Sequence, residues 1–108
     1  MLNVLFICSQ NRLRSPTAER HFADWPGVKT ASAGISNDAY VPVNLELLQW
    51  AELIVVMEPI HRNKLMARFG SELADKPVVC LDIPDIFQYM EPALIKLLDE
   101  RVARYLPS

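Results

Sequence analysis

The sequence predicts an α/β fold with a four-stranded parallel sheet and helices on both of its faces. Two observations indicate this class. Four short, almost continuously apolar runs recur along the chain, as in strands that are buried on both sides. Segments whose apolar residues have helical spacing alternate with these runs, and such alternation is typical of parallel sheets. Right-handed crossovers would put helices on both faces, which makes the sheet doubly wound, while the spacing leaves the strand order open.

Length and composition predict a single domain over residues 1–108. A chain of 108 residues can bury one modest core, and 51% hydrophobic with 22% charged residues is ordinary for globular proteins. The net charge of −2 gives no general reason to expect nucleic acid or an anionic membrane as a partner.

Cysteine usage and the N-terminal sequence favour a cytoplasmic protein. Cys8 and Cys80 lie far apart and lack the spacing of metal ligands, which suits a reducing compartment better than a disulfide scaffold. The first apolar run is shorter than a signal peptide and lacks a basic leader, and no stretch approaches membrane-spanning length. We therefore expect no membrane location and no metal site.

The first half of the chain supplies two strands and one helix. Strands are predicted at Leu2–Ile7 and Val28–Ala33. Between them, Pro16–Trp25 has helical spacing, and Pro26-Gly27 ends that helix. Gly34–Val43 is rich in turn residues and reads as a loop. It leaves the carboxyl end of the second strand, which is the edge where doubly wound sheets bind ligands.

The second half supplies two strands and three helices. Asn44 can cap a short helix that precedes a third strand at Leu53–Met57. The next helix begins at Glu58-Pro59, and the last begins at Glu91-Pro92 after a fourth strand at Pro77–Leu81. In the middle helix we expect an apolar stripe that faces inward, formed by Ile60, Leu65, Met66 and Phe69. We expect its polar face, formed by His61, Arg62, Lys64 and Arg68, to face outward.

The stretch after the first strand has the composition of an anion-binding loop. Cys8 and Arg14 stand six positions apart between a strand and a helix. Such a loop can curl until its N–H groups and the helix dipole converge on one anion, and the same field stabilises a thiolate nucleophile at Cys8. Arg14 can donate two hydrogen bonds to one tetrahedral anion. The substrate-binding candidates are Ser9, Gln10, Asn11, Arg12, Leu13, Arg14 and Ser15.

A structural explanation of this stretch is weaker than the functional one. A cysteine after a strand is more often a buried small hydrophobe than a nucleophile. Here Ser15 also fits a helix N-cap and Pro16 fits the first helical position. No packing reason puts Arg12 and Arg14 beside a thiol unless an anion binds there, so the whole pattern favours an anion site.

This stretch resembles the phosphate loop of the low-molecular-weight protein tyrosine phosphatases, in which a cysteine, five residues, an arginine and a serine or threonine follow one another. Asn11 falls where that family has a loop asparagine, Ser32-Ala33-Gly34 matches its Ser-Ala-Gly, and Ile83-Pro84-Asp85 resembles the Ile-Pro-Asp-Pro segment of bacterial members. The chain would be a short, divergent bacterial-type member, because Gln10 and Leu13 replace a usual glycine and a frequent cysteine. The resemblance implies the strand order 2-1-3-4.

Cleavage of a phosphate ester also needs a proton donor for the leaving oxygen, which the loop lacks. Asp82 and Asp85 follow the fourth strand, and either could reach over the site. The resemblance favours Asp85, which aligns with the general acid of the family, and leaves Asp82 as the alternative. It also implies that Phe87 lines the pocket. Tyr40 is either a second wall for an aromatic substrate or an ordinary surface side chain.

The activity implied by the resemblance is a cysteine-dependent phosphomonoester hydrolase, specifically a protein tyrosine phosphatase with a phosphocysteine intermediate at Cys8. Ser15 would hydrogen-bond the Cys8 sulfur, Asp85 would act as acid and then as base, and no cofactor would be needed. The substrate would be a phosphorylated protein or a small aryl phosphate. Two alternatives stay open: a non-catalytic module that binds phosphate or a phosphoprotein, and an arsenate reductase, less favoured because Leu13 and Cys80 provide no thiol relay.

Overall fold

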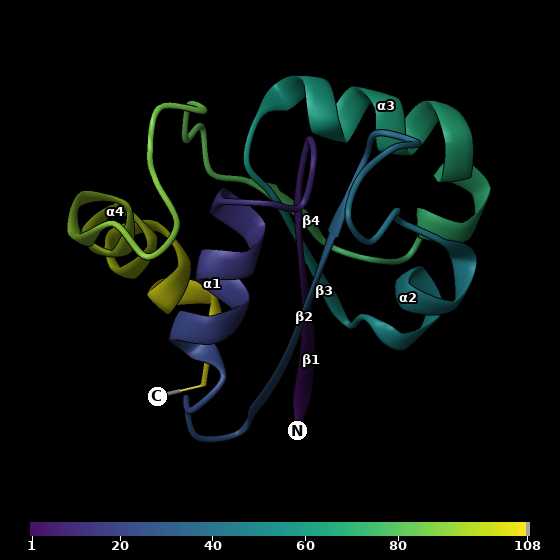
Figure 1. Ribbon diagram of the computed structural model, residues 1–108. Helices are drawn as coiled ribbons and strands as arrows, with labels where there is room; N and C mark the ends of the chain where they lie inside the picture. The colour runs from purple at the N-terminus through teal and green to yellow at the C-terminus, as the bar shows by residue number, and fades with distance from the viewer. Residues whose placement is uncertain (108) are drawn as a thin grey trace.

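Strand β1 (Leu2–Cys8) lies inside the sheet of the computed structural model, which describes residues 1–107 (Figure 1). The strand order is β2-β1-β3-β4, and all neighbouring strands are parallel. The other three strands are β2 (Val28–Gly34), β3 (Leu53–Val56) and β4 (Val78–Cys80). The predicted doubly wound α/β fold and the order 2-1-3-4 are therefore confirmed.

Helices cover both faces of this sheet. In Figure 1, α1 and α4 lie on one side of the strands and α2 and α3 lie on the other. The helices are α1 (Arg14–Phe22), α2 (Leu45–Trp50), α3 (Pro59–Phe69) and α4 (Pro92–Val102), with short 3-10 helices at Gly70–Leu73 and Ala103–Tyr105. None of the helices within residues 1–107 is long and apolar enough to cross a bilayer.

Each face of the sheet has its own hydrophobic core. Along β1, Phe6 and Cys8 face the core under α1 and α4, whereas Leu5 and Ile7 face the core under α2 and α3. This alternation is the period of two that every strand imposes on its side chains. The last residue of the strand, Cys8, is thereby directed to the side on which α1 begins.

The start of α1 differs from the prediction. The helix begins at Arg14, so Ser15, predicted as the N-cap, is its second residue, and the cap position is Leu13, which makes no side-chain cap bond. The reason is that the Leu13 carbonyl already accepts hydrogen bonds from the backbone N–H and the hydroxyl of Thr17. The helix also ends earlier, at Phe22, and leaves Trp25 in the following turn.

The orientation of α3 was also predicted wrongly in part. Ile60 and Met66, predicted to face inward, are 51% and 42% exposed, whereas His61, predicted on the polar face, is buried. A capping box causes this rotation, because the Glu58 backbone N–H donates to the His61 ring while the Glu58 side chain accepts from the backbone of His61. The first turn of the helix is therefore oriented by polar contacts rather than by its apolar stripe.

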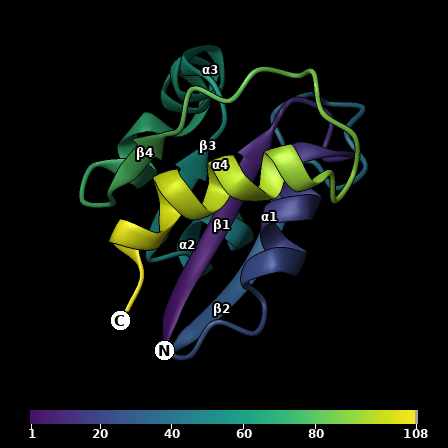
Figure 2. The same cartoon turned by 90° about the vertical axis from the view of Figure 1, so that its left-hand side faces the viewer.

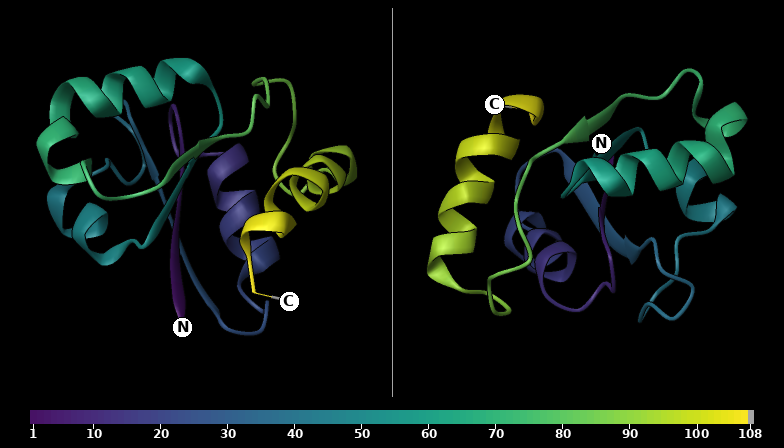
Figure 3. Two further views of the ribbon diagram at one scale, coloured as in Figure 1. Left: turned by 180° about the vertical axis from the view of Figure 1, so that it is seen from behind. Right: turned by 90° about the horizontal axis from the view of Figure 1, so that it is seen from above.

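The connections after β1, β2, β3 and β4 meet at the carboxyl edge of the sheet. Figure 2 shows the long segment between β4 and α4 arching over this edge toward the start of α1. Seen from above in Figure 3, the β1–α1 loop lies between that segment and the β2–α2 connection. The edge that parallel sheets use for ligands is thus bordered by three irregular segments.

Candidate active site

The β1–α1 loop is held in shape by the segment that follows β2. Backbone N–H groups of Ile35 and Ser36 donate to the carbonyls of Cys8 and Ser9 at 2.9 and 3.0 Å, and the N–H of Tyr40 donates to the Gln10 carbonyl at 3.0 Å. In a planar trans peptide the N–H points opposite to the carbonyl. The N–H groups that follow these three carbonyls therefore turn toward the inside of the loop, as an anion-binding nest requires.

Asn11 fixes the turn of the loop. Its φ of 57° lies in the left-handed region, which asparagine tolerates better than most residues. The buried side-chain amide donates to the hydroxyls of Ser15 and Ser32, both at 2.9 Å. Ser32 in turn donates to the carboxylate of Glu19 on α1. These bonds connect the loop to β2 and α1.

The Cys8 sulfur lies at the floor of the loop, 3.0 Å from the Ser15 hydroxyl oxygen. Because that oxygen accepts from Asn11, its own proton is available to donate, either to the sulfur or to the Ala33 carbonyl 3.3 Å away. A hydroxyl that donates to sulfur stabilises the thiolate, which is the nucleophilic form of cysteine.

Arg14 is buried, but only part of its guanidinium is used by the protein. Its Nη1 donates to the carboxylate of Glu58 and to the Ile83 carbonyl, the latter at 2.7 Å. Its Nε lies 3.7 Å from the Asp85 carboxylate, beyond hydrogen-bond distance. Among residues 1–107, no acceptor forms a hydrogen bond with Nε or Nη2. This edge of the guanidinium can therefore bind two oxygens of a tetrahedral anion.

A cavity of about 210 Å³ opens over the loop, and it brings together the predicted nucleophile, arginine and acid: it is lined by Cys8, Gln10, Arg12, Leu13, Arg14 and Asp85. Asp82, the alternative acid, lines a different cavity together with Cys80. The two cysteines consequently do not share a site, and both are free thiols.

The two aromatic candidates lie outside this lining. Tyr40 is 83% exposed on the β2–α2 connection and is linked to the loop only through its backbone bond to Gln10. Phe87 is partly buried and packs against the core under α1 and α4. Their predicted contact with substrate stays a prediction.

Arg12 carries an exposed charge at the mouth of the cavity and forms no ion pair within the described chain. The pKa of Asp38, on the β2–α2 connection, lies below its usual value. The main cause is a hydrogen bond from the Ser36 hydroxyl, with smaller contributions from Gln10 and the Arg12 charge. The cavity is thus lined by one exposed positive charge, that of Arg12, and one buried one, that of Arg14.

Sequence analysis missed two residues of the site, Glu58 and His61, both in the first turn of α3. The His61 Nε2 lies 2.7 Å from the Ser9 hydroxyl, and its Nδ1 accepts from the Glu58 N–H at 3.1 Å. Since a backbone N–H can only donate, Nδ1 is unprotonated and Nε2 donates to Ser9. Burial, followed by the nearby Arg14 charge, lowers the pKa of His61 to about 4, which keeps the ring neutral. An acid three residues before a histidine at a helix start was the available signal.

The first turn of α3 therefore contacts both ends of the β1–α1 loop. His61 binds Ser9 at its start, and Glu58 binds Arg14 at its end. The arrangement offers a buried sulfur, inward N–H groups, a guanidinium edge and a carboxyl group in one cavity. Within residues 1–107, no three His, Cys, Asp or Glu side chains form a potential metal cluster.

Comparison with known proteins identifies the fold. No family model matches the sequence, and no curated protein matches it significantly. Among solved structures, the chain is similar to a low-molecular-weight protein tyrosine phosphatase from Streptococcus pyogenes, with a TM-score of 0.79, 14% identity and coverage of 100% of this chain and 95% of that one. The tyrosine phosphatase Wzb from Escherichia coli in complex with phosphate matches with a TM-score of 0.77, 21% identity and coverage of 97% and 96%.

A third similar structure is the arginine phosphatase YwlE from Geobacillus stearothermophilus, with a TM-score of 0.69, 22% identity and coverage of 97% of this chain and 95% of that one. The chain thus has the fold of the low-molecular-weight phosphatases over nearly its whole length.

Proposed function

We propose that this chain is a cysteine-dependent phosphomonoester hydrolase of the protein tyrosine phosphatase kind. The observation that carries the proposal is the shared cavity, in which Cys8, Arg14 and Asp85 line one space of about 210 Å³. The fold shared with phosphatases supports it. The substrate is a phosphorylated protein or a small aryl phosphate, and the working compartment is the cytoplasm, where thiols stay reduced.

In the first step the Cys8 thiolate attacks phosphorus. A sulfur–phosphorus bond forms while the bond from phosphorus to the leaving oxygen breaks, and protonated Asp85 gives its proton to that oxygen. The loop N–H groups and the free edge of Arg14 stabilise the equatorial oxygens as their charge shifts. The products of this step are the free alcohol or phenol and phosphocysteine.

In the second step water replaces sulfur on phosphorus. The Asp85 carboxylate takes one proton from the water, the oxygen–phosphorus bond forms, and the sulfur–phosphorus bond breaks. Inorganic phosphate leaves, Cys8 returns as the thiolate that Ser15 stabilises, and Asp85 is protonated again for the next cycle.

The exposed charge of Arg12 favours an aryl phosphate over phosphoarginine. Tyrosine and arginine phosphatases both occur among the similar structures. A phosphoarginine substrate would bring a guanidinium group into a cavity that Arg12 already lines with a positive charge, and like charges repel at such distances. A phenyl ring carries no charge and can pack on the stem of Arg12 or on Leu13.

The direct test is hydrolysis of p-nitrophenyl phosphate and of phosphotyrosine and phosphoarginine peptides, without added metal. We expect turnover of the first two and little of the third. Cys8→Ser should lower kcat by a factor of about 10³ or more while phosphate still binds. Asp85→Asn should lower kcat/KM about 10²- to 10⁴-fold for poor leaving groups. Full activity in Cys8→Ser would exclude the proposed nucleophile, and a larger loss in Asp82→Asn would transfer the acid role to Asp82.

A module that binds phosphate without turning it over is the second candidate. The small cavity and the position of Asp85, drawn toward Arg14 rather than standing free, favour it. It predicts that wild type binds phosphate through Arg14 but releases no product from any aryl phosphate, which the same assay detects.

A further inference from the structure

The segment that carries Asp85 has little internal structure to hold it in place. Residues 81–91 between β4 and α4 form no helix or strand, and most of their side chains are exposed. The carboxylate itself is exposed, and its approach to Arg14 is longer than a hydrogen bond. A proton donor must nevertheless stay within hydrogen-bond reach of the leaving oxygen. The contacts that fix the two ends of this segment, called the acid segment below, therefore determine where the Asp85 carboxyl lies.

The first anchor is Ile83, two residues before Asp85. Its N–H donates to the Met57 carbonyl at 2.8 Å, and its carbonyl accepts from Arg14 Nη1 at 2.7 Å. The side chain is fully buried in the core under α1 and α4. This end of the segment is thus attached to Met57, the residue after β3, and to Arg14 at the end of the β1–α1 loop.

The second anchor is a backbone group five residues after Asp85. The N–H of Met90 donates to the Thr17 hydroxyl oxygen at 2.9 Å. The same hydroxyl donates to the Leu13 carbonyl at 2.6 Å. Leu13 lines the cavity over Cys8, so one buried hydroxyl joins the end of the acid segment to the wall of the site.

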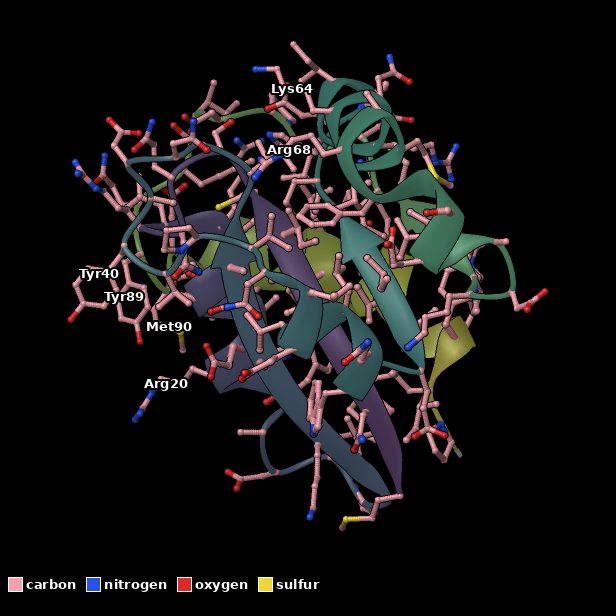
Figure 4. The ribbon with its side chains drawn as sticks, turned by 90° about the vertical axis from the view of Figure 1, so that its right-hand side faces the viewer. Arg20, Tyr40, Lys64, Arg68, Tyr89 and Met90 are labelled. Atoms are coloured by element: carbon pink, nitrogen blue, oxygen red, sulfur yellow. The ribbon has the colours of Figure 1, made fainter. Side chains whose placement is uncertain are left out.

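Met90 lies in a turn that is closed by the Glu91 N–H, which donates to the Gln88 carbonyl at 3.1 Å. The Met90 φ of 59° is left-handed, which is uncommon for a residue with a long side chain. The half-buried Met90 side chain and the exposed Tyr89 side chain line an open groove along α1 beside Arg20 (Figure 4). The turn accounts for this backbone conformation, and the bond from the Met90 N–H to Thr17 attaches the turn to α1.

The hydroxyl of Thr17 makes both bonds at once. It has one proton to donate to Leu13 and lone pairs to accept from Met90. Valine has nearly the same shape and can do neither, whereas serine can do both. Comparison of Thr17→Val with Thr17→Ser therefore distinguishes the effect of the two hydrogen bonds from the effect of side-chain packing.

We propose that Thr17 is a positioning residue, whose hydroxyl holds the far end of the acid segment against the phosphate loop and so keeps Asp85 over the cavity. The inference rests on the function proposed above, because it concerns the acid of that reaction. It assigns no chemical step to Thr17, which acts through Asp85.

The test compares kcat/KM for aryl phosphates whose leaving phenols differ in pKa. In Thr17→Val, kcat/KM should fall about tenfold for poor leaving groups and much less for good ones, since good leaving groups need little proton donation. Thr17→Ser should restore the wild-type dependence. Thr30→Val is the matched control, because Thr30 also donates a partly buried hydrogen bond to a backbone carbonyl, that of Glu19 at 2.9 Å, on the same helix. It should leave the leaving-group dependence unchanged.

A double-mutant cycle shows whether Thr17 acts through the acid. In the Asp85→Asn background, Thr17→Val should cause no further loss, because the group it positions is absent. A further tenfold loss there, together with weaker phosphate binding, would mean that Thr17 supports the phosphate loop instead, and it would overturn the proposal. Equal losses for all leaving groups in Thr17→Val would do the same.

A measurement without turnover keeps the inference separate from the proposed function. Hydrogen exchange at the Met90 amide should be about tenfold faster in Thr17→Val than in wild type or Thr17→Ser. If wild type turns over no aryl phosphate, the hydrolase function fails, and the anchor is still judged on this exchange. Equal exchange in wild type and Thr17→Val would overturn the anchor whatever the activity.

Discussion

At the scale of single residues, Gly34, the last residue of β2, lies very close to the backbone of the β1–α1 loop. A Cβ at this position would lie 2.4 Å from the Cβ of Ala39, 2.7 Å from the Ser9 carbonyl oxygen and 3.0 Å from the Asn11 nitrogen. Two of these three atoms belong to the backbone of the β1–α1 loop. Only a residue without a side chain lets β2 pass beneath the loop at this distance.

We therefore expect Gly34→Ala to destabilise the protein by about 1–3 kcal/mol, because the loop backbone must shift to admit the methyl group. Urea denaturation measures the free energy of unfolding, and phosphate titration measures the damage to the loop. The matched control is Gly70→Ala, since no atom lies within 4 Å of a Cβ there and its backbone is right-handed. It should change stability by less than about 1 kcal/mol. Equal stability of the two variants would mean that Gly34 and the backbone of the β1–α1 loop are not as close as described.

Sequence analysis found the residues of the loop but not their supports. Cys8 and Arg14 were recognisable because their chemistry and spacing are local. His61 was predicted on an exposed face because helical spacing describes only its own element, whereas its partner Ser9 lies 52 positions away in the sequence. The acid–histidine spacing at the start of α3 was visible, but it predicts a cap and not a contact with another loop.

At the scale of elements, the first turn of α3 gives the fold a dependence on pH. The pKa of His61 is lowered to about 4 in the folded chain, mainly by burial, from an ordinary value of 6.5. As the pH falls below 6.5, His61 binds a proton in the unfolded chain, whereas in the folded chain it stays neutral until about pH 4. The free energy of unfolding should therefore fall as the pH decreases from about 6.5 to about 4. Above pH 6.5, where His61 is neutral in both the folded and the unfolded chain, it causes no such loss.

Urea denaturation at a series of pH values between 4 and 7 measures this dependence. In His61→Gln, which can still accept from Glu58 and donate to Ser9, the slope of stability against pH in this window should be smaller than in wild type. An unchanged slope in that variant would mean that other groups cause the pH dependence.

The elements themselves were predictable, and their ends were less so. Each apolar run became a strand because burial on both faces requires continuous hydrophobicity. The start of α1 was misplaced because Ser15 and Pro16 are good residues for a helix start, yet the hydrogen bonds of Thr17 to Leu13 extend the helix back to Arg14. The hydrogen bonds that the Leu13 carbonyl accepts thus outweighed the capping preference of Ser15.

At the scale of the whole molecule, the fold builds the site by bringing distant segments to one edge. The loop after β1 supplies the sulfur and the guanidinium, the β2–α2 connection orients the loop carbonyls, α3 contacts both loop ends, and the β4–α4 segment brings the acid (Figure 3). Periodicity predicted the four strands, but the order came only with the family resemblance, since pairing of β1 with both β2 and β3 is a long-range property.

Because the loop, the acid segment and α3 are tied to one another, an anion in the cavity should stabilise the entire domain. A ligand that binds only the folded state at ten times its Kd adds about 1.4 kcal/mol to the free energy of unfolding. For a domain of roughly 100 residues this corresponds to a rise in Tm of roughly 6–11 °C. Thermal unfolding with and without inorganic phosphate measures it.

The variants assign this stabilisation to the site. Cys8→Ser should keep most of the rise in Tm, because the N–H groups and Arg14 that bind the anion remain. Arg14→Lys should lose most of it, since a single ammonium group cannot satisfy Glu58, the Ile83 carbonyl and two phosphate oxygens at once. An equal rise in wild type and Arg14→Lys would mean that phosphate binds elsewhere. The cavity over Cys8 would then lack the anion affinity on which both the hydrolase and the binding module depend.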